Sequence, residues 1–348
     1  MFRNLRLFLA LSGLALAAAF TSCSLVDSDL SNCDREFHLD YQLRLVTNIT
    51  TELQTELAMQ QDGEVRSLLE DYLKNIFRDY ARDVDLSFYN VETPMERSFH
   101  MTKEMNASET SYVLTLPVQE YRHLAVANIA SCKNVILEGG GYCNTSSFVQ
   151  IPQDGIVEPH KAGLFTARTD MSVLSNKDQS FDVTLYMTNA ASALVLDVSE
   201  AGPVKDLVVR LDGLADGFSI SDSTYVFSGK ENISTDMLQT QDQNTRCYAS
   251  VHFPSANLPG SKVIIDDGDD QDGKLSEDPM WSWKVYAKMP DGTIVESLVH
   301  VYSPLLAGHI KVLKAKLMYN GVVYTEDTGV GVSVTLDWKN GGEYPVYF

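Results

Sequence analysis

Residues 36–47 read Glu-Phe-His-Leu-Asp-Tyr-Gln-Leu-Arg-Leu-Val-Thr, and the alternation in this stretch indicates the fold class of the chain. Every second residue is apolar, namely Phe37, Leu39, Tyr41, Leu43 and Leu45. Successive side chains of a β-strand point to opposite faces, so this pattern predicts a strand that is buried on one face and exposed on the other.

Short stretches of the same kind follow along the rest of the chain. They cover residues 84–89, 111–116, 122–129, 135–137, 148–151, 181–187, 193–198, 207–211, 225–227, 247–253, 282–287, 293–301, 309–318 and 330–338. Turn signals separate several of them, at Asp212-Gly213, Asp291-Gly292 and Asn320-Gly321. Many short strands divided in this way are typical of a β-sandwich, so we predict a mainly all-β protein.

One segment, between residues 64 and 83, follows a different period. Its apolar residues recur at steps of three and four, which predicts an amphipathic helix. They are Val65, Leu68, Leu69, Tyr72, Leu73, Ile76, Phe77 and Tyr80. The polar face carries both signs of charge, unlike the basic face of a helix that lies on a membrane. We therefore expect the helix to pack on its own domain.

The apolar pattern fades between residues 160 and 180, and we expect a domain boundary there. At 348 residues the chain is long enough for two domains with separate cores. The expected organisation is an N-terminal β-sandwich domain over residues 35–170, which contains the helix, and a C-terminal β-sandwich domain over residues 171–348.

The first residues are typical of an exported protein. Arg3 and Arg6 precede an apolar run over residues 7–20, and a basic start before a short apolar core indicates a signal peptide. The run is shorter than the roughly 20 residues that span a bilayer. Cys23 follows Thr21-Ser22 and resembles the lipobox cysteine of bacterial lipoproteins, although Phe20 stands where leucine is usual.

The lipobox resemblance implies that residues 1–22 are removed as a lipoprotein signal peptide and that Cys23 carries acyl chains such as palmitate. Residues 23–34, which are polar and acidic, then form a lipidated tether. Each buried methylene contributes about 0.8 kcal/mol, so several acyl chains attach a soluble domain stably to a membrane. The alternative is an ordinary cleaved signal peptide whose cysteine is incidental.

The charge of the chain excludes some partners. Lys and Arg number 27 against 47 Asp and Glu, a formal net charge of −20. Such a chain is repelled by nucleic acid and by anionic membrane surfaces, so we predict no nucleic-acid partner and expect lipid to supply the membrane attachment.

Four cysteines remain besides Cys23, namely Cys33, Cys132, Cys143 and Cys247. An even number in an exported protein permits disulfides, and four cysteines allow three pairings. Cys132 and Cys143 flank a glycine-rich turn at residues 138–141, so a hairpin bridge between them and a link from Cys33 both remain open. There is no CxxC spacing, and we predict no metal site.

No sequence motif points to catalysis. The acidic stretch at residues 266–278 invites a calcium interpretation, but an EF-hand alignment puts Gly268 at the first position and Pro279 at the twelfth. It is better explained as an acidic surface loop, and calcium binding there stays open. Motifs of hydrolases, metalloproteases and phosphate-binding loops are absent, so we predict a non-enzyme without a cofactor.

Three tryptophans, Trp281, Trp283 and Trp338, could form a platform that stacks on sugars or could pack in the core. Trp281 and Trp283 share one face of a predicted strand, which favours packing.

Three segments carry a resemblance to a known family. Residues 81–90 read Ala-Arg-Asp-Val-Asp-Leu-Ser-Phe-Tyr-Asn, and residues 116–128 read Leu-Pro-Val-Gln-Glu-Tyr-Arg-His-Leu-Ala-Val-Ala-Asn. They resemble a strand and a segment of proline, turn, tyrosine and hydrophobic strand in the fimbrillin-associated anchor proteins of Bacteroidales, the minor fimbrium anchor family. Residues 181–198, followed by residues 204–213, fit the opening of the second domain of that family. Gln119-Glu120 stand where relatives often have glycine, and the next strand lacks their tryptophan.

This resemblance implies two tandem transthyretin-like β-sandwich domains and a role in a fimbrium. In these fimbriae an arginine-specific protease removes the first strand of each stalk subunit, and a C-terminal strand of a neighbour fills the groove. The anchor keeps its first strand, stays lipidated and ends the polymer at the cell outer membrane. The implied partners are fimbrial stalk subunits and, through the lipid on Cys23, the outer membrane.

On this interpretation residues 36–47, which include Arg44, stay in place and close the first domain. The candidate donor is the C-terminal segment over residues 330–348, in which Val330, Val332, Val334, Leu336 and Trp338 alternate and Tyr344-Pro-Val-Tyr-Phe348 forms an apolar end. The alternative is that residues 330–338 are simply the last strand of their own sandwich. The rival function is a surface glycan-binding lipoprotein, which predicts exposed tryptophans where an anchor predicts buried ones.

Overall fold

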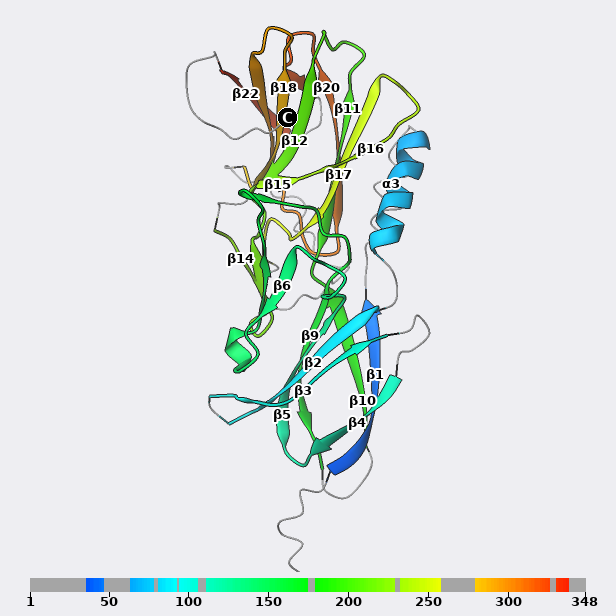
Figure 1. The fold of residues 1–348 in the computed structure, drawn as a ribbon, viewed down its shortest axis with the longest axis vertical. Coiled ribbons are helices and arrows are strands. Elements are labelled where there is room, and N and C mark those ends of the chain that lie inside the picture. Colours follow the sequence, from blue (N-terminus) through cyan, green and yellow to red (C-terminus); the bar gives the residue numbers. More distant parts are fainter. Residues whose placement is uncertain are drawn as a thin grey trace, which may run out of the picture.

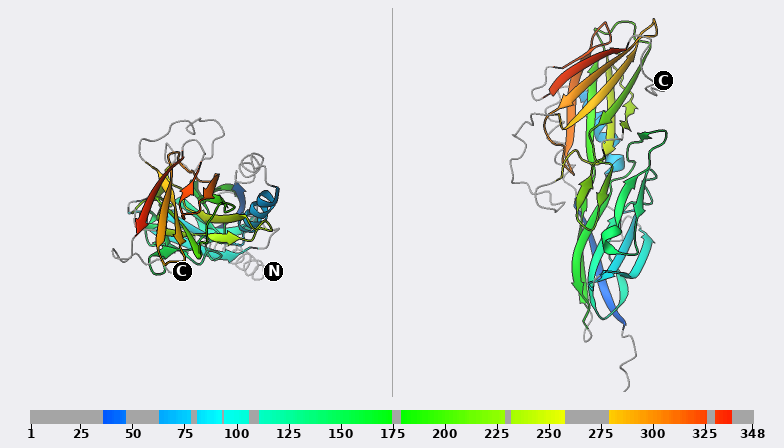
Figure 2. Two further views of the ribbon diagram at one scale, coloured as in Figure 1. Left: turned by 90° about the horizontal axis from the view of Figure 1, so that it is seen from above. Right: turned by 90° about the vertical axis from the view of Figure 1, so that its left-hand side faces the viewer.

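The computed structural model describes residues 36–46, 63–77, 81–92, 94–105, 111–174, 179–228, 232–257, 279–325 and 330–337. The strands within these ranges form four sheets, two in a lower unit and two in an upper unit, which follow one another along the long axis of the molecule (Figures 1 and 2). The prediction of a mainly β protein of sandwich-like domains with one amphipathic helix is confirmed.

The lower unit combines a seven-stranded and a four-stranded sheet. In spatial order the seven strands are β3 (Arg97–Glu104), β2 (Asp83–Asn90), β5 (Glu120–Ala127), β9 (Phe165–Ser172), β10 (Gln179–Met187), β1 (Glu36–Val46) and β4 (Ser111–Pro117). The four are β14 (Thr224–Val226), β13 (Gly217–Ser219), β7 (Ser147–Gln150) and β6 (Val135–Glu138), with the short 3-10 helix η2 (Cys143–Thr145) between β6 and β7.

The upper unit is a sandwich of a five-stranded and a six-stranded sheet. The five strands are β16 (Asp236–Leu238), β17 (Thr245–His252), β11 (Ala190–Asp197), β20 (Ile310–Leu317) and β21 (Val323–Tyr324). The six are β22 (Val330–Asp337), β19 (Ile294–Val301), β18 (Trp281–Lys288), β12 (Asp206–Asp212), β15 (Asn232–Ser234) and β8 (Ile156–Val157).

Three apolar clusters hold these layers together. One lies between the two upper sheets and contains Leu194, Leu211 and Trp283. A second lies between the two lower sheets around Phe148 and Phe218. The third and largest runs from the face of the seven-stranded sheet that points away from the four-stranded sheet to the face of the upper five-stranded sheet that points away from its six-stranded partner, so the two units share a core.

The strand expected to open the C-terminal domain, residues 181–187, instead belongs to the lower unit. It forms β10, which lies between β9 and β1 in the seven-stranded sheet. Its main partner is β1, in parallel register from Leu39–Gln179 to Val46–Tyr186. A parallel partner is always distant in sequence, so the local alternation that predicted the strand could not show where it pairs.

Short strands also cross between the units. β8 comes from the first half of the chain but joins β15 in the upper sandwich, whereas β13 comes from the second half but pairs with β7 below. The boundary expected near residue 170 therefore does not correspond to a single crossing of the chain from one unit to the other.

The predicted helix forms α3 (Gly63–Ile76), which ends before the expected end at residue 83. Its buried side chains, such as Leu69 and Leu73, join a cluster with Ala193 and Ala249 of the upper five-stranded sheet. Alanines on that face let a helix approach closely. The expectation that α3 packs on the strands of the N-terminal domain is therefore corrected, because it lies beside β16 and β17 of the upper unit (Figure 1).

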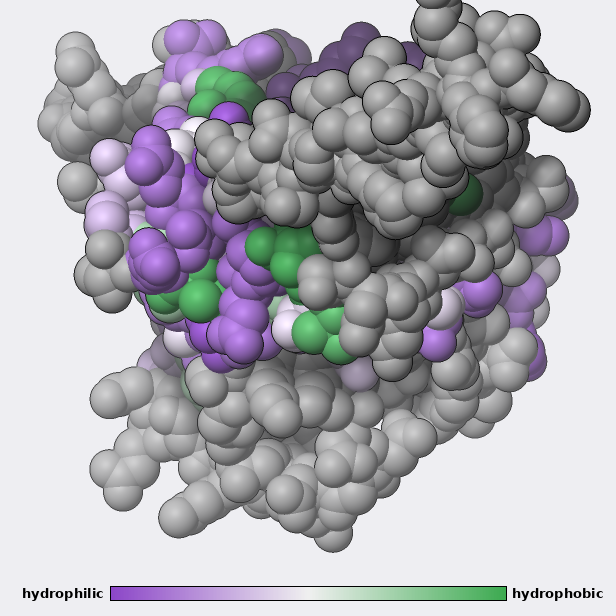
Figure 3. All heavy atoms as spheres, turned by 90° about the horizontal axis from the view of Figure 1, so that it is seen from below, coloured by the Kyte–Doolittle hydropathy of each residue, from purple (hydrophilic) through white to green (hydrophobic). Residues whose placement is uncertain are grey.

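The lower end of the molecule is mainly hydrophilic over the described residues, with separate small apolar patches (Figure 3). Such a surface agrees with the acidic composition of the chain.

Candidate functional site

The first candidate site is the position of β1 within the seven-stranded sheet. β1 pairs with β10 on one side and with β4 on the other, and β4 has no other neighbour in this sheet. Arg44 lies within the ladder, opposite Thr184 of β10. Removing β1 would therefore leave backbone groups of two strands without partners, so this position is closed only while β1 is in place.

A buried polar contact fixes β1 from inside the unit. The hydroxyl of Tyr41, which is fully buried, makes a hydrogen bond with Nε2 of His123 on β5. Nδ1 of His123 donates to the backbone carbonyl of Ser87 at 3.0 Å, so Nε2 is left to accept the proton of Tyr41. Burial lowers the pKa of His123 to about 4, which keeps the ring neutral.

The second candidate site is β22, which contains the predicted donor residues Val330, Val332, Val334 and Leu336. β22 is the edge strand of the six-stranded sheet and pairs with β19 from Ile294–Asp337 to Val301–Val330. Trp338 lies outside the described residues. In the isolated chain this segment is thus the last strand of its own sandwich, and its donation to a neighbour stays a prediction.

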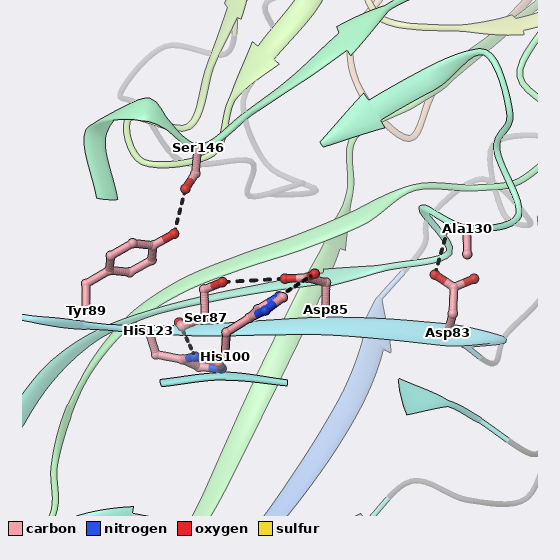
Figure 4. Close-up of polar contacts among 8 residues, drawn as sticks. All are labelled: Asp83, Asp85, Ser87, Tyr89, His100, His123, Ala130 and Ser146. Atoms are coloured by element: carbon pink, nitrogen blue, oxygen red, sulfur yellow. Dashed lines mark hydrogen bonds and ion pairs between the residues drawn. The ribbon is translucent and has the colours of Figure 1, made fainter. Parts of the chain in front are cut away.

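Polar side chains also gather along β2, on the face toward the four-stranded sheet (Figure 4). Asp83 accepts from the backbone N–H of Ala130 at 3.0 Å, and the hydroxyls of Tyr89 and Ser146 lie 2.7 Å apart. These contacts tie β2 to the segments that carry β6, η2 and β7.

Asp85 and His100, which the sequence left as scattered residues, form a hydrogen bond with 2.8 Å between Oδ2 and Nε2. In a catalytic triad the carboxylate bonds Nδ1 of the histidine, whereas Asp85 contacts Nε2 of His100. The hydroxyl of Ser87 is directed to Asp85. We therefore interpret this pair as a contact between the neighbouring strands β2 and β3.

Two more buried histidines lie where the units meet. The ring nitrogens of His160 contact the side chains of Gln150, at 2.9 Å, and Asn189, at 2.6 Å. Nε2 of His252 lies 2.8 Å from the hydroxyl of Ser192. Burial lowers the pKa to about 3 for His160 and about 4 for His252.

Solved structures with a similar fold come from Bacteroidales. A candidate adhesin from Bacteroides ovatus matches 78% of this chain and 85% of its own, with 12% identity and a TM-score of 0.51. A second candidate adhesin from Bacteroides ovatus matches 88% of this chain and 97% of its own, with 12% identity and a TM-score of 0.50. The chain has the fold of these candidate adhesins.

Another similar structure is the fimbrial anchor protein Mfa2 of Porphyromonas gingivalis, with 8% identity, 74% of this chain covered, 80% of that chain covered and a TM-score of 0.45. Identities this low establish the fold alone. Known protein families give no match to the sequence, and neither do curated proteins.

The cysteines do not form the hairpin bridge that was one of the open alternatives. Cys132 and Cys143 are both free and buried between the two sheets of the lower unit. The register of the hairpin explains this, since Val135 pairs with Gln150 and Cys143 lies in the connection rather than opposite Cys132. Burial raises the pKa of Cys132 to about 11, so its thiol is unreactive. Cys247 is buried on β17 in a different cluster.

Trp281 and Trp283 are 2% and 0% exposed, so neither offers a stacking face. Nε1 of Trp281 donates to the carbonyl of Ser303 at 3.1 Å. The glycan platform that these tryptophans could have formed is therefore not present.

The remaining sequence predictions fall partly outside the described residues. Cys23, Cys33, Trp338 and the acidic stretch at residues 266–278 lie there. Within the described ranges, no three His, Cys, Asp or Glu side chains come together as metal ligands. Among the helices described, none has the length and apolar character needed to cross a membrane.

Proposed function

We propose that this protein is a structural lipoprotein that ends a fimbrium at the cell outer membrane, as its anchor or a related minor subunit. The observation that carries the proposal is the position of β1. A subunit that receives a neighbour's strand needs an open place in its sheet, and here the chain's own β1 fills the place between β10 and β4. Such a subunit terminates a chain of strand exchange on its N-terminal side.

The other side of the exchange is β22. Among the described strands it has one neighbour, β19, and a strand with one neighbour loses a single ladder when it leaves. Donation to a stalk subunit would replace that ladder with new backbone pairs in the partner's groove. The fold shared with candidate adhesins supports a role in fimbriae or adhesion.

Replacing Cys23 tests the anchoring. Fimbriae in cells of the native host that express Cys23→Ala should appear in the medium and be depleted from the cells, because acylation is lost. Cys33→Ala, a change in the same tether, is the matched control and should leave fimbriae on the cells. Fimbriae that stay cell-bound in the Cys23 variant would remove the anchor role.

Truncation after Lys339 tests whether donation needs the residues that follow β22. The shortened protein should fold with an unchanged unfolding midpoint, because residues 330–337 of β22 are retained. It should nevertheless fail to capture purified stalk subunits in a pull-down, because the apolar end Tyr344-Pro-Val-Tyr-Phe348 is gone. Normal capture by the truncated chain would show that donation does not need this segment.

A further inference from the structure

A pocket of about 630 Å³ lies in the lower unit, where three connections meet over the seven-stranded sheet. Arg122 of β5 and Arg168 of β9 form its base. Its walls are the turn between β2 and β3, the η2 segment and the turn between β13 and β14. The volume falls in the range of about 300–1,000 Å³ that is usual for small-molecule sites.

Backbone contacts hold the walls in place without a ligand. The N–H of Cys143 donates to the carbonyl of Met95 at 3.1 Å, and the N–H of Arg97 donates to that of Gly141 at 2.9 Å. Gly139 has φ +90, and a Cβ there would stand 2.2 Å from the carbonyl oxygen of Thr145. The η2 segment is thus closed tightly on itself and bonded to the β2–β3 turn, which makes the pocket preformed.

The charges at the pocket balance. Arg122 makes a two-pronged ion pair with Asp170, in which Nη2 lies 3.1 Å from Oδ2. Arg168 donates to the carbonyl of Ser221. Asp222, on the rim, accepts from the hydroxyl of Ser219 at 2.9 Å. Two guanidinium groups and two carboxylates therefore meet here, and neither a simple anion nor a simple cation finds an excess of opposite charge.

The same groups suit a ligand whose groups both donate and accept. Arg168 offers further N–H donors, Asp222 offers acceptors, and the carboxamide of Asn144 offers both. Tyr142 is 43% exposed at the edge and presents a ring. A sugar combines hydroxyl groups that donate and accept with C–H faces that stack on an aromatic ring.

We propose that this pocket binds a neutral oligosaccharide, with Tyr142 stacking on a sugar ring and Arg168, Asp222 and Asn144 bonded to its hydroxyls. The inference is independent of the proposed function, because it uses neither β1, β22 nor Cys23. It also places sugar binding at residues unlike the tryptophans that the sequence suggested.

The test is titration of the purified protein with maltotriose, cellotriose, mannotriose and N-acetylchitotriose, followed by calorimetry and ligand-observed NMR. At least one should bind with a Kd of about 10 mM or tighter, which corresponds to a free energy of a few kcal/mol. Tyr142→Ala and Arg168→Gln should each weaken binding at least about 10-fold, a factor that corresponds to about 1.4 kcal/mol. Tyr319→Ala, which changes a tyrosine that is 74% exposed on the upper unit, is the matched control and should bind as the parent does.

Several results would overturn the assignment. The assignment fails if the protein binds none of the four sugars. It also fails if both Tyr142→Ala and Arg168→Gln leave binding unchanged. Preference for an acidic probe such as sialyllactose, with affinity that falls steeply with salt, would reject a neutral ligand. Thermal unfolding of each variant shows that it is folded, and Asn144→Ala supplies a second exposed position if Arg168→Gln proves unstable.

Discussion

Asn128 shows how a single residue can hold several segments together. It is buried and has φ 69, a backbone conformation that Asn tolerates better than most residues. Its Nδ2 donates to the carbonyl of Gly163 at 2.8 Å, and its Oδ1 accepts from the N–H of Arg82 at 2.8 Å. One side chain therefore connects the start of β2, the end of β5 and the approach to β9.

Asn128→Ala should lower the free energy of unfolding by about 3 kcal/mol, because it removes two buried hydrogen bonds and places a Cβ in a left-handed backbone. Asn128→Gly removes the same hydrogen bonds, but glycine adopts the left-handed backbone conformation without strain. The free energy of unfolding should therefore fall by about 1 kcal/mol less in this variant than in Asn128→Ala. Urea unfolding measures both. Equal losses in the two variants would mean that the backbone conformation contributes nothing.

Little at this scale follows from the sequence. The alternation predicted that β5 ends near Asn128, but the partners of its carboxamide are 46 residues before it and 35 after it. The same limit applies to Tyr41 and His123, which are 82 residues apart and belong to strands that are not neighbours in the sheet. Only the fold brings such residues together.

Helix α3 illustrates the scale of the element. The spacing of its apolar residues predicted a helix, but nothing in its sequence indicates which sheet the helix packs on. Tyr72 supplies a specific contact, because its hydroxyl donates to Oδ2 of Asp236 on β16 at 2.7 Å. Burial raises the pKa of Tyr72, with a further contribution from Asp236, so the hydroxyl keeps its proton. Lys161 binds the same carboxylate at 2.5 Å.

Tyr72→Phe should therefore destabilise the protein by about 1 kcal/mol through the lost hydrogen bond. The rate of amide hydrogen exchange should rise most in α3 and β16, because the hydrogen bond that joins these two elements is lost. Ser67→Ala, on the exposed face of the same helix, is the control and should leave exchange in β16 unchanged. Unchanged exchange in the Tyr72 variant would show that apolar packing alone holds the helix.

At the scale of the element, sequence reasoning succeeds where a pattern is local and fails where pairing is distant. The alternation at residues 36–47 predicted β1 nearly to the residue. Within the donor segment, residues 330–337 likewise form a strand, β22. The partner of β1, by contrast, is β10, and the candidate sugar pocket is built from five separate segments that carry no shared motif.

At the scale of the whole molecule, the shared core and the crossing strands join the two units. The sequence predicted two sandwiches in succession, whereas one apolar cluster includes residues of both, from Tyr41 below to Val312 above. His160 and His252 lie at this junction, and His123 lies inside the lower unit. All three are buried and neutral, so their protonation bears on the stability of the whole chain.

Stability should fall as the pH falls from about 6.5 toward about 4, because the unfolded chain then binds protons at these histidines and the folded chain does not. Each histidine contributes a slope of up to about 1.4 kcal/mol per pH unit in this window, and none above it. Urea unfolding at about pH 7, 6 and 5 measures the slope, since most carboxylates titrate lower. A slope that His252→Gln leaves unchanged would contradict the assignment for that residue.

The direction in which β1 runs has a mechanical consequence. The strand starts at Glu36 at the lower extremity and extends upward beside β10 (Figure 1). A pull on the segment before residue 36 therefore acts along the strand, and its backbone bonds to β10 and β4 are loaded together in shear rather than opened one after another. A chain that is tethered at that end would resist tension with the ladders on both sides of β1, the longest of the described strands, and drag on the far end of the molecule would load these two ladders.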